Sequence, residues 1–274
     1  MPDPMSSRHT PSVSPARVAQ HPVFERLARA GFVVSGLLHL LVGYLAVRIA
    51  FGERATADQT GALATLAGKP GGPVALWFAA AALLLLGCWR LVETVLGRSS
   101  DQRDGSSSGA LERAKALALA VVYLALAYSA VGFARGAGRS ADQQNSTISA
   151  RLMQSTPGTV ALVLCGVTVV AVGGYHVYKG ASRNFLDDLN GNSGNVIRRL
   201  GVVGYIGKGL VIVAAGALVI GAALHSQPQQ ATGLDGALKT LGAQPYGRVL
   251  LIGAALGIVT YGLYSFAMAR LTKM

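Results

Sequence analysis

The sequence predicts an all-α integral membrane protein whose six transmembrane helices form three parallel two-helix repeats with pseudo-threefold symmetry. Hydrophobic residues make up 51% of the 274 residues and charged residues 13%, whereas soluble domains carry about 25% charged residues. Six apolar stretches are each close to the ~20 residues that a membrane-spanning helix needs. The segments between these stretches recur at a nearly constant spacing, which is typical of internal repeats.

The six apolar stretches lie at 30–50, 73–96, 114–135, 158–179, 201–224 and 247–270. Stretches of this length with so few charges favour helices that cross a bilayer over helices of a soluble core. The 35 glycines support this prediction, because glycine is more frequent in membrane helices than in soluble ones.

The repeats are clearest in the connection before each even-numbered helix. Residues 61–70 (GALATLAGKP) return as 236–245 (GALKTLGAQP), and a weaker copy ends at Pro157. Each copy predicts a short amphipathic helix followed by proline, which is well tolerated in the first turn of the next helix. Leu63, Leu66 and Ala67 share one face of the first copy, and a short helix with this stripe is expected to lie at the outer membrane interface or to cap the bundle; the alternative is an ordered loop packed on the helix tops.

Further motifs end the even-numbered helices, namely 173–186 (GGYHVYKGASRNFL) and 260–271 (TYGLYSFAMARL). With the connections, they make residues 20–271 resemble a bacterial membrane protein family, common in actinobacteria, that has three tandem copies of a domain of unknown function. The resemblance implies a six-helix plasma-membrane protein and transfers no activity.

The predicted organisation is a disordered cytoplasmic tail at 1–25, three repeats and two linkers. The repeats lie at 26–98, 113–185 and 199–271, and the linkers at 99–112 and 186–198. Counting Lys and Arg gives fourteen at the termini and the loops after the second and fourth helices, against eight at the other loops. Positive charge concentrates on the cytoplasmic side of membrane proteins, so we expect both termini there.

The net charge of +12 does not predict nucleic-acid binding. The basic residues flank apolar segments instead of forming a basic face, so the expected partners are the bilayer and its anionic headgroups.

His39 lies near the middle of the first predicted helix. An ionisable residue there indicates a functional site by default, and the alternative is a neutral imidazole that hydrogen-bonds a neighbouring helix.

A second set of candidate ligand-binding residues lies one to two turns from the predicted cytoplasmic ends. It consists of Arg90, Glu93, His176, Lys179 and Lys208. If these side chains converge, they form an inner vestibule for an anionic group or lipid headgroup. The alternative for the lysines is snorkelling to the headgroups, and for Glu93 an ion pair with Arg90 on one helix face.

No catalytic or metal-binding pattern is visible, and Asp187 and Asp188 are interpreted as solvated turn residues. We therefore expect no enzyme, no cofactor and no metal. An intramembrane enzyme is the least favoured class, because no nucleophile–base or metal constellation is visible. Two other functions remain. The first is binding or passage of a small solute, ion or lipid in the helical bundle. The second is a non-catalytic scaffold that uses glycine-rich helix faces, such as Gly132-x-x-x-Gly136 and Gly253-x-x-x-Gly257, and the cytoplasmic loops.

Overall fold

The computed structural model describes residues 22–96, 109–189 and 194–272. Most of the predicted tail at 1–25, most of the linker at 99–112 and four residues of the linker at 186–198 lie outside the described residues. All regular secondary structure in the described part of the chain is helical, apart from one β-bridge between Leu189 and Thr272.

Six helices of the described chain are long and apolar enough to cross a membrane, which confirms the predicted fold class. They are α2 (Pro22–Ala50), α4 (Gly72–Leu96), α5 (Gly109–Ala134), α7 (Thr156–Ser182), α8 (Asn195–Leu224) and α10 (Gly247–Leu271). The protein is therefore a multi-pass membrane protein.

A short helix precedes the second, fourth and sixth spans, which are α4, α7 and α10, as the repeats predict. These helices are α3 (Gln59–Ala67), α6 (Ala141–Leu152) and α9 (Leu234–Gly242), and two 3₁₀ turns, η1 (Asn184–Leu186) and η2 (Pro228–Gln230), complete the described elements. On α3 the predicted apolar stripe is partly exposed, with Leu66 36% exposed, while Thr60, Gly61 and Ala62 are buried. The first turn of α3 is buried instead, because it carries polar contacts to the other repeats.

A glycine lies in the first turn of each of the spans α4, α7 and α10, directly against the end of the preceding short helix. A Cβ at Gly72 would be 1.9 Å from the carbonyl oxygen of Leu66, one at Gly158 2.1 Å from that of Leu152, and one at Gly247 1.9 Å from that of Gly242. The proline and glycine of the repeat motif therefore fix a close turn between the short helix and the span, in all three copies.

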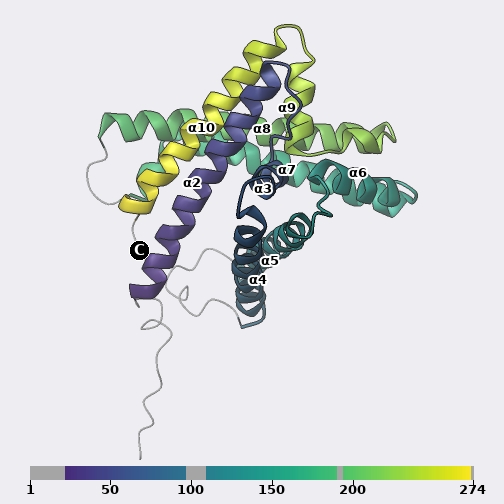
Figure 1. Ribbon diagram of the computed structural model, residues 1–274. Coiled ribbons are helices and arrows are strands. Elements are labelled where there is room, and N and C mark those ends of the chain that lie inside the picture. Colours follow the sequence, from purple (N-terminus) through teal and green to yellow (C-terminus); the bar gives the residue numbers. More distant parts are fainter. Residues whose placement is uncertain (1–21, 97–108, 190–193, 273–274) are drawn as a thin grey trace, which may run out of the picture.

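The long helices pack most extensively between repeats. α4 packs against α5, α7 against α8, and α10 against α2, so the second helix of each repeat joins the first helix of the next and the last pair closes the cycle. Figure 1 shows these three pairs running in different directions, and α10 also contacts α8. The separate two-helix hairpins suggested by the repeat pattern are therefore replaced by pairs that cross repeat boundaries.

Glycines spaced seven residues apart make these close contacts. Gly166, Gly173 and Gly180 line α7 and meet the α8 face that holds Gly209 and Gly216. A Cβ at Gly173 would lie 2.7 Å from a backbone nitrogen of α8, so the two backbones are in direct contact. Such small-residue contacts are a main source of helix association in lipid.

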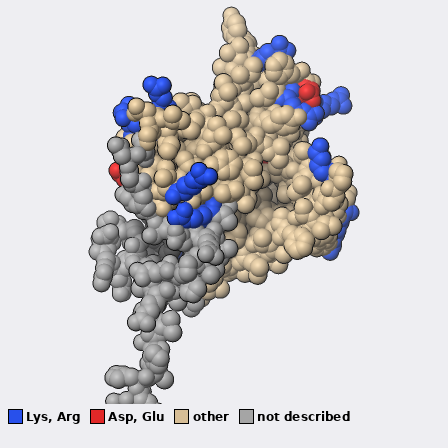
Figure 2. Space-filling view, turned by 60° about the vertical axis from the view of Figure 1, so that its left-hand side comes forward, with Lys and Arg blue, Asp and Glu red and all other residues tan. Residues whose placement is uncertain are grey.

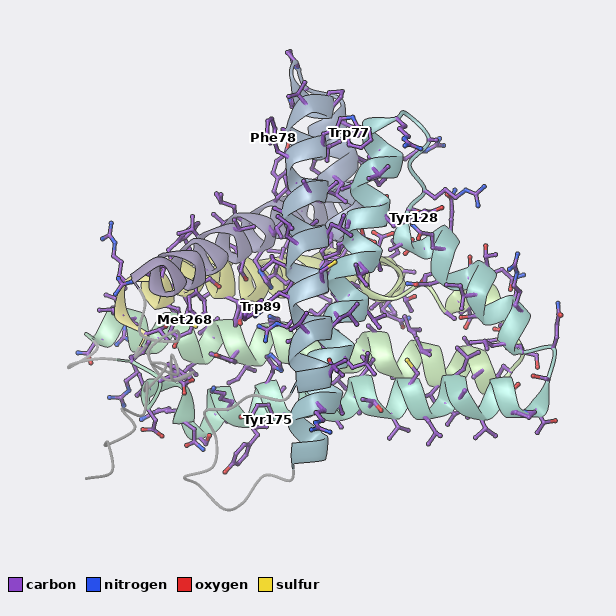
Figure 3. The ribbon with its side chains drawn as sticks, turned by 90° about the horizontal axis from the view of Figure 1, so that it is seen from below. Trp77, Phe78, Trp89, Tyr128, Tyr175 and Met268 are labelled. Carbon is purple, nitrogen blue, oxygen red and sulfur yellow. The ribbon has the colours of Figure 1, made fainter. Side chains whose placement is uncertain are left out.

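The pairs expose large apolar side chains on their outer surfaces. Trp77, Phe78, Trp89 and Tyr128 are 47%, 74%, 48% and 76% exposed and project from the α4–α5 pair (Figure 3). Figure 2 shows a broad surface without charged residues between groups of Lys and Arg. Exposed apolar surface of this extent matches embedding in a lipid bilayer.

The start of α2 and the end of α10 lie on one side of the molecule. The Arg29 guanidinium Nη1 donates to the Ala269 carbonyl oxygen at 3.4 Å, and the bridge from Leu189 to Thr272 brings the end of the second repeat to the same place. We call this the terminal side, and the opposite side, which holds α3, α6 and α9, the connection side.

Candidate functional site

Four aromatic rings fill the space between α8, α10 and η1. Tyr205 lies 5.2 Å from Tyr261, 5.6 Å from Tyr264 and 5.4 Å from Phe185, measured between ring centroids. Phe185 and Tyr264 are fully buried and contact each other at 5.3 Å. We call Phe185, Tyr205, Tyr261 and Tyr264 the aromatic cluster.

Glycines on α8 make room for these rings. A Cβ at Gly204 would lie 2.7 Å from the backbone of Tyr261, and one at Gly201 would lie 2.2 Å from the Phe185 ring. Phe185 reaches this place because α7 ends at Arg183 in the left-handed conformation, at φ 63°, which turns the chain back toward α8.

His39 enters the aromatic cluster from α2. Its Nδ1 lies 2.7 Å from the Ser35 carbonyl oxygen, and its ring centroid lies 4.8 Å from that of Tyr261. Because a carbonyl oxygen only accepts, Nδ1 carries the proton and Nε2 stays free to accept in the neutral ring. The approach is possible because α10 presents Gly262 to the His39 Cβ.

Lys208 contacts the same tyrosine from α8. Its ammonium Nζ is 3.8 Å from the centroid of the Tyr261 ring, which is a cation–π contact. No ion pair joins Lys208 to a carboxylate among the described side chains. A half-buried cation within the spans is therefore held by an aromatic face and lacks a counter-ion in the described chain.

His176 and Lys179 enter the cluster from α7. The His176 ring centroid lies 5.9 Å from that of Tyr205, and its Nδ1 lies 2.8 Å from the Val172 carbonyl oxygen. Lys179 Nζ lies 5.7 Å from the Tyr205 ring centroid and donates to Asp188 Oδ2 at 2.6 Å. Asp188 lies in a turn and is exposed, as predicted, and it also pairs with Lys179.

Arg90 and Glu93 lie on α4, which packs with α5 and not with the helices of the aromatic cluster. The side chain of Glu93 lies outside the described residues, so the Arg90–Glu93 pair stays a prediction. The structure thus gathers four of the six predicted residues, His39, His176, Lys179 and Lys208, around two tyrosines.

A second cluster, which the sequence did not indicate, lies on the connection side. Asp58, Asp142 and Asp235 come from the three repeats and lie close enough for their charges to interact, and Lys239 lies beside two of them. Lys239 forms an ion pair with Asp235 and approaches Asp142 Oδ2 at 3.6 Å. We call these four residues the acid cluster.

Backbone contacts place each acid. Asp58 caps α3 by accepting from the Gly61 backbone nitrogen at 2.8 Å and from the Thr60 hydroxyl at 2.7 Å. Asp235 Oδ1 accepts from the Ala57 nitrogen at 2.7 Å, which joins the third repeat to the first. The Ala141 nitrogen donates to the Thr60 Oγ1 at 2.9 Å, which joins the second repeat to the first.

The acids are deeply placed for charged groups. Asp58 is 2% exposed and Asp235 is fully buried. Burial raises the pKa of Asp142 to about 7, with a further contribution from the hydrogen bond and the charge of Asp235. Burial also raises the pKa of Asp58, against the opposing effect of its hydrogen bonds from Thr60 and Gly61. Burial disfavours the charged form of Lys239, but Asp235 and Asp142 outweigh it and raise its pKa.

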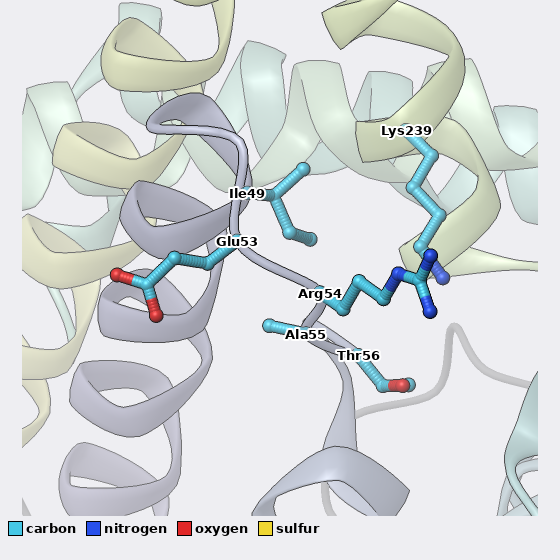
Figure 4. Close-up of a pocket in the computed structure, with 6 residues that line it drawn as sticks. All are labelled: Ile49, Glu53, Arg54, Ala55, Thr56 and Lys239. Atoms are coloured by element: carbon cyan, nitrogen blue, oxygen red, sulfur yellow. The ribbon is translucent and has the colours of Figure 1, made fainter.

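A pocket of about 460 Å³ opens beside the acid cluster (Figure 4). Its lining is Ile49, Glu53, Arg54, Ala55, Thr56 and Lys239. Lys239 therefore has one side toward this pocket and the other toward the acids. Within the described chain, no group of three or more His, Cys, Asp or Glu residues is arranged to hold a metal ion.

Comparison with known proteins identifies the repeats. The model of the Domain of Unknown Function (DUF1206) matches residues 30–97, 114–183 and 203–272, which together are more than half of the chain. The chain belongs to the DUF1206 family. It carries three tandem copies of this domain, as the resemblance predicted.

One relative is the "Uncharacterized protein YxxB" of Bacillus subtilis (strain 168). It is 27% identical over 249 residues, which cover 89% of this chain and 90% of the relative. No solved structure matches the chain.

The three DUF1206 copies contribute differently to the two clusters. His39 comes from the first copy, His176 and Lys179 from the second, and Tyr205 and Lys208 from the third. The acid cluster likewise takes one aspartate from each copy, at positions that are not equivalent in the repeat. Each cluster is therefore assembled once, from parts of all three copies, and is not repeated threefold.

A weak signal for the acid cluster was present in the sequence. Asp58, Asp142 and Asp235 each lie at the start of a connection helix in the structure, where an acid ordinarily caps the helix or interacts with its dipole. That explanation is sufficient for each residue alone, so it gave no reason to bring the three together.

Proposed function

We propose that this DUF1206 protein is a non-catalytic binding protein whose aromatic cluster takes an anionic group, either a lipid headgroup or a small anionic solute. The observation that carries the proposal is the Lys208 ammonium within the spans, which rests on the Tyr261 ring and has no carboxylate partner among the described side chains. An unpaired cation in such a place is expensive, so an anionic ligand that pairs with it stabilises the complex.

The surrounding residues fit the same ligand. His39 and His176 each hold Nδ1 on a backbone carbonyl, which leaves the second ring nitrogen for another partner. On α7, Tyr175 and Tyr178 are 59% and 60% exposed beside His176 and Lys179. A ligand that lies in the bilayer can therefore approach this edge of the cluster from the lipid.

Binding fits the geometry better than passage. Phe185 and Tyr264 are fully buried, and Tyr205 and Tyr261 are nearly so. Rings thus occupy the space between α8 and α10, where a through-going path between these helices would have to run.

The scaffold alternative has less support. Gly207 and Gly257 contact each other across α8 and α10, and the other close-packed glycines face helices of the same chain. Of the predicted glycine motifs, Gly253 has open space beside it and Gly136 lies beyond the end of α5 at φ 74°. The closest glycine faces are thus used inside the molecule, and a partner would have to use other surfaces.

The cellular placement belongs to the same proposal. With both termini in the cytoplasm of a plasma membrane, as the charge distribution predicts, Lys208 lies about 12 Å along α8 from Leu200, at ~1.5 Å per residue, and so in the cytoplasmic half of the bilayer. That leaflet carries an anionic surface, which favours an anionic lipid as the ligand.

The test is the thermal stability of the purified full-length protein in detergent, with phosphatidylglycerol, phosphatidylcholine, inorganic phosphate and succinate as probes. A ligand that binds only the folded state stabilises it by about 2.7 kcal/mol at one hundred times its Kd. We expect phosphatidylglycerol to raise the melting temperature of the protein, and phosphatidylcholine not to. Inorganic phosphate or succinate acting alone would identify a solute site.

Lys208→Gln and His39→Leu are expected to remove the phosphatidylglycerol shift. Lys69→Gln, which removes an exposed lysine on the connection side, is the matched control and keeps it. Equal responses of Lys208→Gln and the wild type to every probe would show that the aromatic cluster is a packing feature.

A further inference from the structure

The acid cluster has more negative charge than its protein partners compensate. Asp142 and Asp235 share one ammonium, that of Lys239, which is ion-paired to Asp235, and Asp58 adds a third carboxylate whose charge interacts with theirs. Two negative charges in a buried place are strongly unfavourable unless something neutralises them. A cation must therefore bind, or a carboxyl group must be protonated.

Three carboxylate oxygens in the cluster have no hydrogen-bond donor in the described chain, namely Asp58 Oδ2, Asp142 Oδ1 and Asp235 Oδ2. Asp235 Oδ2 forms the ion pair with Lys239, whereas Asp58, which is 2% exposed, has no such pair among the described side chains. Unsatisfied buried acceptors are rare in folded proteins because each one loses its hydration without replacement. Their presence in one cluster points to a small positively charged ligand.

The donors already present select where this ligand binds. Asp58 receives the Gly61 nitrogen and the Thr60 hydroxyl, and Asp235 receives the Ala57 nitrogen and the Lys239 ammonium. Asp142 has only Lys239, at 3.6 Å. Its carboxylate is the least stabilised of the three, and it shares the Lys239 ammonium with Asp235, which brings these two carboxyl groups close together.

We propose that the acid cluster is a proton-binding site, in which one proton is held between the carboxyl groups of Asp142 and Asp235. The proton converts one carboxylate into a donor, so that Asp142 and Asp235 form a hydrogen bond instead of repelling each other. Because Asp142 begins α6 and Asp235 begins α9, the proton fastens the second DUF1206 copy to the third. The site is separate from the aromatic cluster and does not depend on the proposed ligand.

The neighbouring charges do not replace this proton. The other charged groups on elements around the cluster are Arg48, Glu53, Arg54, Lys69, Arg135, Arg139, Arg151, His225 and Arg248. Arg48 is paired with Glu53 at 2.5 Å, and Arg248 donates to the Ala50 carbonyl oxygen at 3.1 Å. The charges that act on Asp142 are those of Asp235, Lys239 and Asp58.

A metal ion is a poorer fit than a proton, because the acids are not arranged to surround one within the described chain. The pocket lined by Thr56 and Lys239 reaches the edge of the cluster (Figure 4) and gives water access to it. The site can therefore exchange its proton with the solution on the connection side.

The sign of the pH effect follows from the direction of the pKa. The pKa of Asp142 is raised to about 7 in the folded protein, whereas a carboxyl of an unfolded chain titrates near ~3.9. Between these values the folded state holds a proton that the unfolded state has released. Stability therefore falls as the pH rises through this window and levels off above it.

The test is the melting temperature of the full-length protein in detergent from pH 5 to pH 8.5, for the wild type and for Asp142→Asn. An asparagine carries a permanent donor and no charge, so it imitates the protonated acid. We expect the wild type to lose several degrees between pH 5 and pH 8, and Asp142→Asn to lose much less and to melt above the wild type at pH 8. Glu53→Gln, which removes an acid of the connection side outside the cluster, is the control and follows the wild type.

Infrared spectroscopy supplies the second readout. A carboxylic-acid C=O band should be present in the wild type at pH 5.5, disappear on titration to pH 8.5 and be absent from Asp142→Asn. Parallel melting curves for the wild type and Asp142→Asn would overturn the proposal. So would stabilisation of the wild type by Na⁺ or Ca²⁺ at pH 8 with no carboxylic-acid band at pH 5.5, because that result identifies a metal-ion site.

Discussion

The contact between Phe185 and Gly201 predicts that Gly201→Ala changes the stability of the protein in opposite directions, depending on whether the Phe185 ring is present. A Cβ at Gly201 would lie 2.2, 2.5 and 2.9 Å from three atoms of the Phe185 ring, and this ring is fully buried against Tyr205 and Tyr264. The ring cannot move aside without disturbing both tyrosines. Gly201 is therefore required by the ring and not by the backbone of α8.

The magnitudes follow from the two opposing effects of Gly201→Ala. Overpacking costs about 1–3 kcal/mol, and the better helix propensity of alanine returns up to about 1 kcal/mol, so we expect a net loss of about 1–2 kcal/mol in the wild type. Phe185→Ala removes the ring and leaves a cavity, at a cost of about 3 kcal/mol. In that background Gly201→Ala meets no ring and should stabilise the protein by about 1 kcal/mol.

The assay is the free energy of unfolding of the four proteins, measured by circular dichroism during SDS titration in mixed micelles. The expected coupling between the two mutations is about 2–3 kcal/mol, within the range found for residues in direct contact. Additive effects of Gly201→Ala and Phe185→Ala would refute the reasoning, because they would mean that the ring and the glycine do not share one space.

Three further predictions use the same measurement. Tyr246 has φ 63° and is 84% exposed, so Tyr246→Gly removes left-handed strain and should stabilise the protein by about 1 kcal/mol; a loss of stability would show that the ring itself contributes. Gly173→Leu should destabilise the protein by about 2–3 kcal/mol, because a Cβ there would lie 2.7 Å from the backbone of α8. The adjacent Gly174→Leu should be nearly neutral, because a Cβ at Gly174 would have no atom within 4 Å. Equal effects of the two substitutions would contradict the α7–α8 contact. Asp58→Ala should lower the free energy of unfolding by about 1 kcal/mol through loss of the helix cap. Asp58→Asn keeps a capping oxygen and should retain most of the wild-type stability. A large loss in Asp58→Asn would mean that the charge itself is needed.

The spans and connections were predictable because their signals are local. Length and hydropathy define a transmembrane helix within one window of the chain, and the proline and glycine of the motif at Pro70 and Gly72 act within one turn. The convergence of His176, Lys179 and Lys208 was also partly predictable, because the sequence places all three within about two turns of the predicted cytoplasmic ends of their apolar stretches.

The pairing of helices across repeats and the acid cluster were not predictable in this way. Pairing depends on which glycine faces meet, and the signal was the seven-residue spacing of Gly166, Gly173 and Gly180, not the four-residue motifs that the sequence analysis singled out. Arg90 was grouped with the other basic residues by its depth, but depth does not reveal that α4 joins α5.

The crossing of helices between copies has a consequence for how the chain folds. In the first copy α2 and α4 lack an extensive contact with each other, and the same holds for α5 and α7 in the second. Close packing, which is a main source of helix association in lipid, is therefore absent from these copies alone and arises only when neighbours are present. The connection side adds polar contacts between different copies, from Ala57 to Asp235 and from Ala141 to Thr60. Three copies close a cycle through α10 and α2, whereas two would leave one helix at each end unpaired, so the three-copy chain is the smallest unit in which every span has a partner.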